Sequence, residues 1–497
     1  KIEEVVSVES LSEMSLLSQV SSGTSGGFAI NEDENINYMK NNPNLNLTGR
    51  NVIIAIADTG IDYLHPDFIN ADGTSKILYL WDQTKEGNSP EGFYFGTEYT
   101  RDDINRAISE NDSTLSTDEV GSGTLLSGIC AGLGVSNSLY EGVAKDSELI
   151  VIKLGTIDGK YNNAYYYVAR DYARKKAREL ERPLIINTSV GTNSDVGFIN
   201  RATQSTIWYQ YGECEIAGIG NEGNTQTHAS GKISSSGETQ TVEIEIEEEE
   251  EFLKIELWIC RPDRVNIKII SPTGEESKDV GLGYYKKESG IFNFENTTYA
   301  VFYVFPTSYS GQEFITINLY NASPGVWKIN LTGVYINSGC YNVYLPNRSL
   351  INQNTRFLEP DPFYTVNFPT VDRNIFTVGA YDMINNSMWP PSSRGPNIRN
   401  IQKPNIVAPG VNIISAYPHN RYGNITGTSA AAAVTSGVAA LFLQYVTQNN
   451  QYKRQGFTQS IYSFFQLGAD REDNIQYPNF IYGYGLLNAR KIFEEFR

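Results

Sequence analysis

The chain is short of histidine, cysteine and positive charge. Its 497 residues include only 3 His and 4 Cys, and 39 Lys+Arg stand against 57 Asp+Glu, so the formal net charge is −18. Such an excess of negative charge repels phosphate backbones and anionic lipid, and no concentrated Lys/Arg block offsets it. Nucleic acid is therefore not expected as a partner.

Long apolar runs are absent as well. Runs such as those at residues 52–57 and 430–434 fall far below the roughly 20 residues that cross a bilayer. We therefore expect a soluble protein without a membrane span. The first residues, KIEEVVSVES, lack the basic and then apolar order of a secretory signal, although trimming before the first residue would remove such a signal.

The four cysteines lie far apart in the sequence, at Cys130, Cys214, Cys260 and Cys340. This spacing fits neither a zinc knuckle nor the framework of a disulfide-dense small domain. We predict four reduced, buried thiols, with one long-range disulfide as the alternative. The cysteines predict no metal site.

Continuous apolar runs that end in turn glycines alternate with helical stretches over much of the chain. A buried parallel strand has such a run. Its alternation with helices indicates a doubly wound α/β domain with a mainly parallel sheet. We expect strands at 52–57, 149–155, 183–191, 214–223 and 374–382, and helices at 163–180, near 200–211 and at 427–446.

Between about residues 230 and 345, apolar and polar residues alternate instead. The half-buried strands of an antiparallel sheet have this period of two. The sequence therefore predicts an antiparallel β-sandwich or jelly roll, inserted into the α/β domain. Its expected strands lie at 242–247, 252–259, 265–270, 314–320 and 326–336.

Two segments carry simpler expectations. The acidic run at 247–251 is expected to be a solvated strand end or hairpin tip, because a cation site needs ligands around a centre. Residues 7–27 are rich in Ser, Gly and Leu and are expected to be partly disordered. The chain then divides into an arm or leader remnant at 1–36, an α/β domain in two parts at 37–229 and 346–497, and the insert at 230–345.

Eight short motifs in a fixed order carry the strongest signal. A Ser-His-Asp site needs a nucleophile, an imidazole base, a carboxylate that orients the base, and oxyanion donors. One group of α/β folds supplies the triad in the order Asp, His, Ser. The motifs are DTGIDYLHPDF (58–68), GSGTLLSG (121–128), NTSVG (187–191), GNEG (220–223), SSRGP (392–396), KPNIVAPG (403–410), GTS (427–429) and GYGLLNA (483–489). Together they resemble the subtilisin-like (S8) serine peptidases over about residues 37–228 and 365–497.

The resemblance implies a role for each matched residue. Asp58 takes the carboxylate position, Ser429 the nucleophile position and Asn221 the position of the side-chain oxyanion donor. We expect Asp58, Ser122 and Ser429 to converge at the C-terminal edge of the parallel sheet, with Asn221 beside them. The substrate-side strand beside the specificity pocket corresponds to Ser189, Val190 and Gly191.

One position departs from the family. Where the family has Gly-His-Gly-Thr-His-Val-Ala-Gly, residues 121–128 are GSGTLLSG, so Ser122 replaces the general base. A serine hydroxyl cannot accept a proton near neutral pH and is too short to join Asp58 to Ser429. Replacing the triad histidine alone in a subtilisin lowers turnover by about 10⁶. The histidines that the chain does have, expected to be structural, are His65, His228 and His419.

The residues around this position have drifted too. Leu125 replaces a second histidine of the family motif, and Ala430, Ala433 and Val434 replace its Met, Pro and His after the nucleophile. Natural loss of activity is therefore favoured, and a single engineered substitution is the alternative.

If the site is inactive, its carboxylate and its hydroxyl are expected to have structural roles. Asp58 would persist as an acceptor of backbone N–H groups, and Ser429 as a helix cap. Because an inactive protein has no need of an open substrate cleft, we expect bulky side chains or the 1–36 arm to fill it.

Within the S8 family, the resemblance narrows further. The jelly-roll insert, the segment NNPNLNLTGRNVIIAIADTGIDYLHPDF (41–68) and the GTSAAAA form of the nucleophile motif are most similar to the Csp proteins of clostridial spores. In that family, active proteases activate a cortex-lytic pro-enzyme during germination, and paralogues with decayed triads act as germinant sensors or regulators. The resemblance implies a pseudoprotease of the CspA/CspC type, located in the cortex or coat region of the spore.

The same resemblance implies the partners. These are an active Csp protease, a cortex-lytic pro-enzyme and a small germinant such as a bile salt or an amino acid. No cofactor is implied, and a structural Ca²⁺ cannot be predicted from the sequence. The alternative function is a weakly active or autoprocessing subtilisin-like endopeptidase, and a structural partner without a ligand is a third.

Overall fold

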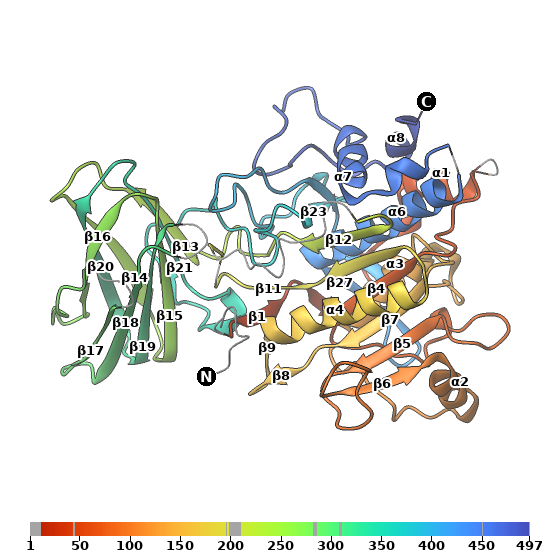
Figure 1. Ribbon diagram of the computed structural model, residues 1–497, viewed down its shortest axis with the longest axis horizontal. Coiled ribbons are helices and arrows are strands. Elements are labelled where there is room, and N and C mark those ends of the chain that lie inside the picture. The colour runs from red at the N-terminus through yellow and green to blue at the C-terminus, as the bar shows by residue number, and fades with distance from the viewer. Residues whose placement is uncertain are drawn as a thin grey trace.

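The chain folds into an α/β domain with an all-β insert at one end of its long axis (Figure 1). The computed structural model describes residues 11–42, 45–194, 196–197, 210–281, 286–307, 311–449 and 451–496. The predicted helix near 200–211 lies almost entirely outside the described residues, which omit 198–209.

A nine-stranded sheet forms the centre of the α/β domain. Its strands run in the order β24-β23-β12-β10-β4-β7-β5-β6, and β25 also pairs with β23. All of these pairs are parallel except those of β6 and β24. The mainly parallel sheet is confirmed. The strands are β4 (Ile53–Asp58), β5 (Ile77–Asp82), β6 (Thr97–Thr100), β7 (Glu148–Lys153), β10 (Leu184–Thr188), β12 (Glu213–Gly218), β23 (Phe376–Asp382), β24 (Ser387–Met388) and β25 (Ile406–Pro409).

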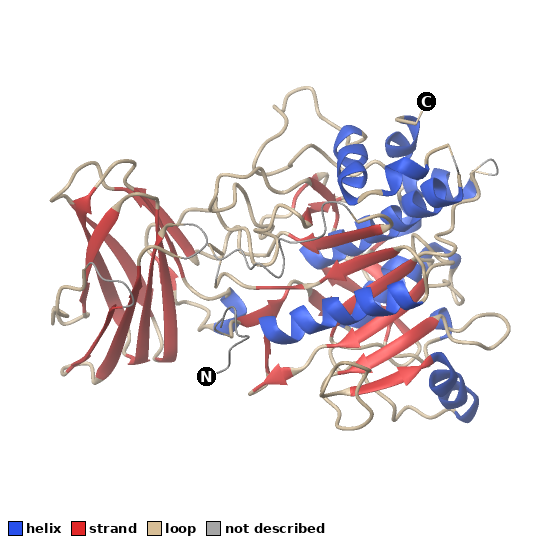
Figure 2. Ribbon diagram, viewed as in Figure 1, coloured by secondary structure: helices blue, strands red, loops and turns tan. Residues whose placement is uncertain are grey.

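Helices cover both faces of this sheet, as Figure 2 shows. Alternate side chains of β4 define the faces: Ile54 and Ile56 join the apolar cluster of α3 and α6, whereas Ile53 and Ala55 join that of α4. The helices are α1 (Glu34–Asn41), α2 (Arg101–Glu110), α3 (Ser122–Ala131), α4 (Asn163–Glu179), α6 (Thr428–Gln448), α7 (Thr458–Leu467) and α8 (Ala489–Glu494). Short 3₁₀ turns lie at Ile30–Glu32, Pro66–Phe68, Ser138–Tyr140, Arg348–Leu350 and Lys453–Gly456.

Helix α6 lies at the centre of the core. Within the described residues it is the one helix long and apolar enough to cross a membrane, and 89% of its most apolar window is buried inside the domain. Its small side chains let neighbouring elements approach closely.

The insert is a sandwich of two antiparallel sheets, as predicted. One sheet has the order β13-β21-β15-β19-β18-β17 and the other β16-β20-β14-β22. All five expected strands are present. The strands are β13 (His228–Lys232), β14 (Thr239–Ile246), β15 (Glu250–Ile259), β16 (Arg264–Ile270), β17 (Lys286–Phe292), β18 (Thr297–Val304), β19 (Glu313–Ala322), β20 (Gly325–Tyr335), β21 (Cys340–Tyr344) and β22 (Arg356–Phe357).

The acidic run makes the turn between β14 and β15. Glu247, Glu248 and Glu249 are exposed there, as expected of a hairpin tip. Glu250 differs, because it is buried and accepts hydrogen bonds from Thr355 Oγ1 (2.5 Å) and Asn352 N (2.9 Å). In the described part of the chain, no group of three or more His, Cys, Asp or Glu is placed to hold a metal ion.

The prediction of four reduced thiols is wrong for one pair. Cys260 and Cys340 form a disulfide, with their Cα atoms 5.5 Å apart. Cys260 follows β15 and Cys340 begins β21, and these strands are neighbours in one sheet. The 80-residue separation hides this pairing, because the strands between the two cysteines fold back on themselves. Cys130 and Cys214 are free, and burial raises the pKa of both thiols.

The predicted disorder of residues 7–27 is also wrong over its described part, residues 11–27. Strand β1 (Glu13–Leu16) lies between β11 (Val190–Gly191) and β9 (Lys160–Asn162), which also pairs with β8 (Thr156–Ile157). After it, β2 (Gln19–Ser21) pairs with β27 (Arg421–Thr426). Strand β27 also pairs with β26 (Ile413–Tyr417), which in turn pairs with β3 (Phe28–Ala29). This segment has little strand propensity of its own, but existing strand edges supply its hydrogen-bond partners.

Candidate active site

Asp58 is the last residue of β4, at the edge where the parallel strands end and where α/β folds bind ligands. It is 0% exposed and accepts hydrogen bonds from Thr59 N (2.7 Å) and Ser189 Oγ. Burial raises the pKa of Asp58 to about 6, against the lowering effect of these hydrogen bonds. The expected role as an acceptor of a backbone N–H group is confirmed.

A second carboxylate, Asp118, fastens the start of α3 to the loop after β4. It accepts hydrogen bonds from Gly121 N (2.7 Å), Thr124 N (2.8 Å) and Thr59 Oγ1 (2.6 Å). The sequence analysis missed Asp118. Its position just before a helix start, with Thr124 in the first turn, is the signal that an N-terminal acceptor gives.

Ser122 is the first residue of α3 and is fully buried. Its hydroxyl lies near enough to Asp58 to lower the pKa of that carboxyl, and its Oγ lies 2.9 Å from Ser18 Oγ. The structure thus brings Ser122 to the carboxylate, at the position that the family motif gives to its histidine. The same hydroxyl is bonded to the N-terminal arm.

Ser429 is the second residue of α6 and is also fully buried. Its Oγ donates to the carbonyl oxygen of Leu17 (2.8 Å), and its N–H donates to the same oxygen (3.3 Å). The expectation that Ser429 caps the helix is wrong, because Gly427 is the N-cap and no side chain caps it. The hydroxyl donates to the arm instead of accepting from an N–H group of the helix.

Asn221 lies beside the nucleophile position, in the loop after β12. Its Oδ1 accepts hydrogen bonds from Thr428 N (3.1 Å) and Thr428 Oγ1 (2.9 Å). These bonds fix the amide next to the residue that precedes Ser429.

The arm runs through this site as a β-strand and reaches Ser429. β1 pairs antiparallel with β11, so that Ser15 opposes Gly191 and Leu16 opposes Val190. Leu17 N donates to Ser189 O (2.8 Å), and the Leu17 carbonyl meets Ser429. Leu17 is 1% exposed. The expectation that the arm fills the cleft is confirmed for residues 13–21.

Two glycines make room for the arm. Gly427 has φ +149, and a Cβ atom there would lie 2.1 Å from the Leu17 carbonyl oxygen. A Cβ atom on Gly191 would lie 3.2 Å from the end of the Leu17 side chain. The sequence analysis missed Leu17 and Ser18, since nothing in a Ser- and Leu-rich segment marks the residue that reaches Ser429.

Two of the three histidines are bonded elsewhere, as expected. His65 Nδ1 accepts from Asp67 N (3.2 Å), and its Nε2 lies 2.9 Å from Arg421 O. Burial lowers the pKa of His228, whose ring nitrogens lie 3.0 Å from Asp361 O and 3.1 Å from Asn342 Oδ1.

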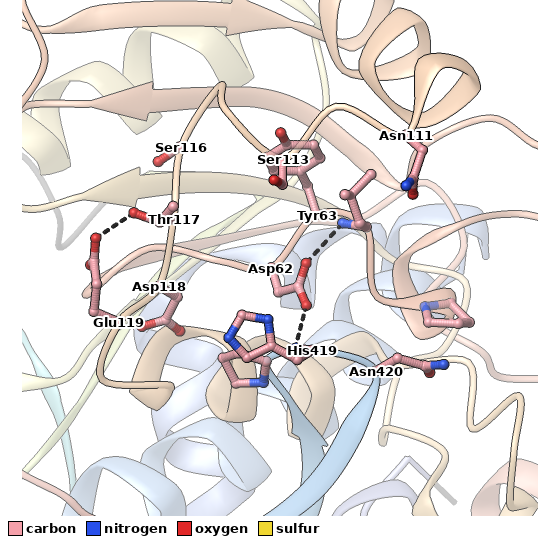
Figure 3. Close-up of a pocket in the computed structure, with 13 residues that line it drawn as sticks. Asp62, Tyr63, Asn111, Ser113, Ser116, Thr117, Asp118, Glu119, His419 and Asn420 are labelled. Carbon is pink, nitrogen blue, oxygen red and sulfur yellow. Dashed lines mark hydrogen bonds between the residues drawn. The ribbon is translucent and has the colours of Figure 1, made fainter.

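His419 is exposed at the tip of the β26–β27 hairpin, with φ +67. Its N–H donates to Asp62 Oδ2 (2.8 Å). It lines a pocket of about 430 Å³ whose walls also carry Asp62, Asp118 and Glu119 (Figure 3). No hydrogen bond in the described structure joins His419 to Asp58 or Ser429.

A parallel sheet that delivers Asp58, with Ser429 at the start of a buried helix and a β-strand groove between them, defines the scaffold of a subtilisin-type serine peptidase. The sequence profile of the Subtilase family (peptidase S8) matches residues 49–247 and 347–485. The chain belongs to this family.

Individual relatives agree with this assignment. The structure of the Clostridium perfringens CspB protease is similar over 93% of this chain and 96% of that one, with a TM-score of 0.85 and 26% identity. The serine protease AprX of Bacillus subtilis is 34% identical over 145 residues, 25% of this chain and 31% of that protein. The C5a peptidase of Streptococcus pyogenes is 21% identical over 443 residues, 80% of this chain and 35% of that protein. The chain thus spans about a third of the length of these two proteases.

Proposed function

We propose that the chain is a proteolytically inactive subtilase that regulates proteolysis. The observation that carries this proposal is Ser122, whose hydroxyl lies beside Asp58 where the reaction needs an imidazole. Acyl transfer requires a base that takes the nucleophile's proton as the bond to the carbonyl carbon forms. A serine hydroxyl does not do this near neutral pH.

The bonding of Ser429 supports the same conclusion. Its hydroxyl donates to the oxygen of the Leu17 carbonyl group, whose carbon an active enzyme would attack. In a working site that oxygen is held by oxyanion donors, and the hydroxyl proton goes to the base. The arm therefore sits on Ser429 as a bound peptide that is not turned over.

The structural similarity to the Clostridium perfringens CspB protease supports a role in spore germination. In this proposal the chain acts in the spore beside an active Csp protease and controls activation of a cortex-lytic pro-enzyme. It does so as a regulator or as the sensor of a small germinant such as a bile salt or an amino acid.

A second candidate function is a single autoproteolytic cut. The register of the arm favours it, because the Leu17–Ser18 peptide bond lies at Ser429. Such a cut would leave Leu17 as a new C-terminus in the cleft.

Turnover of a peptide library tests the proposal. We compare the full chain with Ser122→His and with Ser429→Ala, using an active subtilisin as the positive control. We expect the wild type to match Ser429→Ala, and Ser122→His to recover little, because the arm and Leu125 occupy the space around the base. Cleavage by the wild type that Ser429→Ala abolishes would overturn the proposal.

Two further readouts address the autoproteolytic cut and the regulatory role. The mass of the intact protein distinguishes a chain with an uncut arm from a chain cut after Leu17. Adding the full chain to the Clostridium perfringens CspB protease should change turnover by that protease, and Ser429→Ala should act equally well. A regulator that works without its own chemistry predicts that equality.

A further inference from the structure

A cavity of about 430 Å³ lies where the insert meets the α/β domain, and its lining residues are separate from those of the peptidase site. The insert contributes Arg261 and the Cys260–Cys340 disulfide to its wall. The α/β domain contributes residues 398–400, from the loop between β24 and β25. Cavities of this size hold small ligands.

Arg261 and Arg399 both line this cavity. Burial lowers the pKa of Arg399, and the positive charge of Arg261 lowers it further. Like charges repel, so a bound anion would relieve the repulsion between the two guanidinium groups.

Arg399 also lacks partners. Its Nε and Nη2 atoms are buried and have no hydrogen-bond partner among the described residues. A guanidinium carries five N–H donors, and buried donors without acceptors cost free energy. Something that accepts hydrogen bonds is therefore missing from this wall.

The carboxylates nearby do not supply the missing hydrogen-bond acceptor. Asp372 raises the pKa of Arg399, but it also acts on buried Lys403, so one carboxylate faces several cations. Asp263 accepts from Asn337 N (2.6 Å) and Ser338 Oγ (2.8 Å), so its oxygens are used within the insert.

The walls are held in place before any ligand arrives. Asn397 Oδ1 accepts from Arg399 N (3.0 Å) and Ile401 N (2.9 Å), and its Nδ2 donates to Val371 O (2.7 Å). On the other side, the disulfide joins the end of β15 to the start of β21. Pre-formed donors bind an anion without the cost of ordering them.

We propose that this cavity binds a small oxyanion, a carboxylate or a phosphate, through the guanidinium groups of Arg399 and Arg261. A planar oxyanion accepts two parallel N–H bonds from one guanidinium, and its charge removes the repulsion between the two. A bound anion touches both parts of the chain, so it fastens the insert to the α/β domain. This proposal does not depend on whether Ser429 is active.

Isothermal titration and thermal unfolding of the full chain test it with two probes, inorganic phosphate and glutarate. Sodium chloride at equal ionic strength controls for screening. We expect saturable binding of at least one probe and a rise in Tm with its concentration. The probe that binds more tightly distinguishes a phosphate from a carboxylate ligand.

The variants are Arg399→Gln and Arg261→Gln, with Arg178→Gln as a matched control on the exposed surface of α4. Each pocket variant should weaken binding at least tenfold and abolish the anion-dependent rise in Tm, whereas Arg178→Gln should bind like the wild type. Arg399→Gln should also keep or raise the Tm of the anion-free protein, a result that a purely structural arginine would not give. If Arg399→Gln does not fold, Arg261→Gln carries the test. No binding of either probe, or equal binding by the pocket variants and the wild type, would overturn the proposal.

Discussion

The substrate cleft and the cavity beside the disulfide both carry polar side chains, but the two sites differ in whether those side chains have partners. In the cleft, the hydroxyls of Ser122 and Ser429 both have partners in the arm. In the cavity, two donor atoms of Arg399 have none among the described residues. The contrast indicates that the chain closes its peptidase site with its own residues, whereas Arg399 at the junction with the insert keeps two donor atoms without a partner among the described residues.

Loss of the disulfide should have the largest effect on stability. Cys260→Ser with Cys340→Ser removes a cross-link between residues 80 apart, and loop-closure arguments put the loss near 4 kcal/mol. Chemical denaturation with and without a reductant measures it. Reductant should destabilise the wild type and leave the double variant unchanged. Equal stability of wild type and double variant without reductant would show that the bond contributes nothing.

The second-largest effect on stability should come from weakening the contact between the arm and the cleft. Leu17→Ala removes a side chain that is 1% exposed, and we expect a loss of about 2–3 kcal/mol, at the low end for buried leucine because the arm can also detach. Leu11→Ala, at a position 59% exposed, is the matched control and should change stability by less than about 0.5 kcal/mol. Limited proteolysis within residues 11–21 should be faster in Leu17→Ala alone. Indistinguishable behaviour of the two variants would mean that the arm is not docked.

The smallest expected effect is a pH dependence at Asp58. Its pKa in the folded chain, about 6, is above the usual aspartate value of 3.8, so its stabilising contribution is complete below pH 3.8 and is lost as the pH rises through 6. Asp58→Asn cannot ionise, so its unfolding free energy relative to wild type should rise between pH 4 and 7 by about 1–3 kcal/mol. Denaturation at four pH values measures this difference. A difference that is flat with pH would contradict the raised pKa.

The elements that the sequence predicts well are those whose signal is local. The run at 52–57 is apolar because β4 is covered on both faces, and the alternation at 242–247 exists because β14 has one buried face. Strand β17, KKESGIF, has neither pattern, because it is the edge strand of its sheet. It was not predicted for that reason.

The residues of the candidate site also divide into those that the sequence can predict and those that it cannot. Asp58, Ser122, Asn221 and Ser429 could be placed because each belongs to a short motif of the family. Leu17, the disulfide and Arg399 could not, because each depends on a contact between distant segments. The arm finds its partners only once the cleft exists, and Arg399 meets Arg261 only once the insert has docked.

The most direct test asks whether Ser429 is inactive because the base is missing or because the arm occupies the cleft. A fluorophosphonate labels a serine only when that serine is activated, so we would treat the wild type, Leu17→Ala and an active subtilisin with the same reagent and locate the adduct by mass. With Ser122 at the base position, we expect no adduct on Ser429 in either form of this chain, and full labelling of the subtilisin. Labelling of Ser429 in Leu17→Ala would contradict the account, because it would show that the arm alone keeps an intact catalytic site silent.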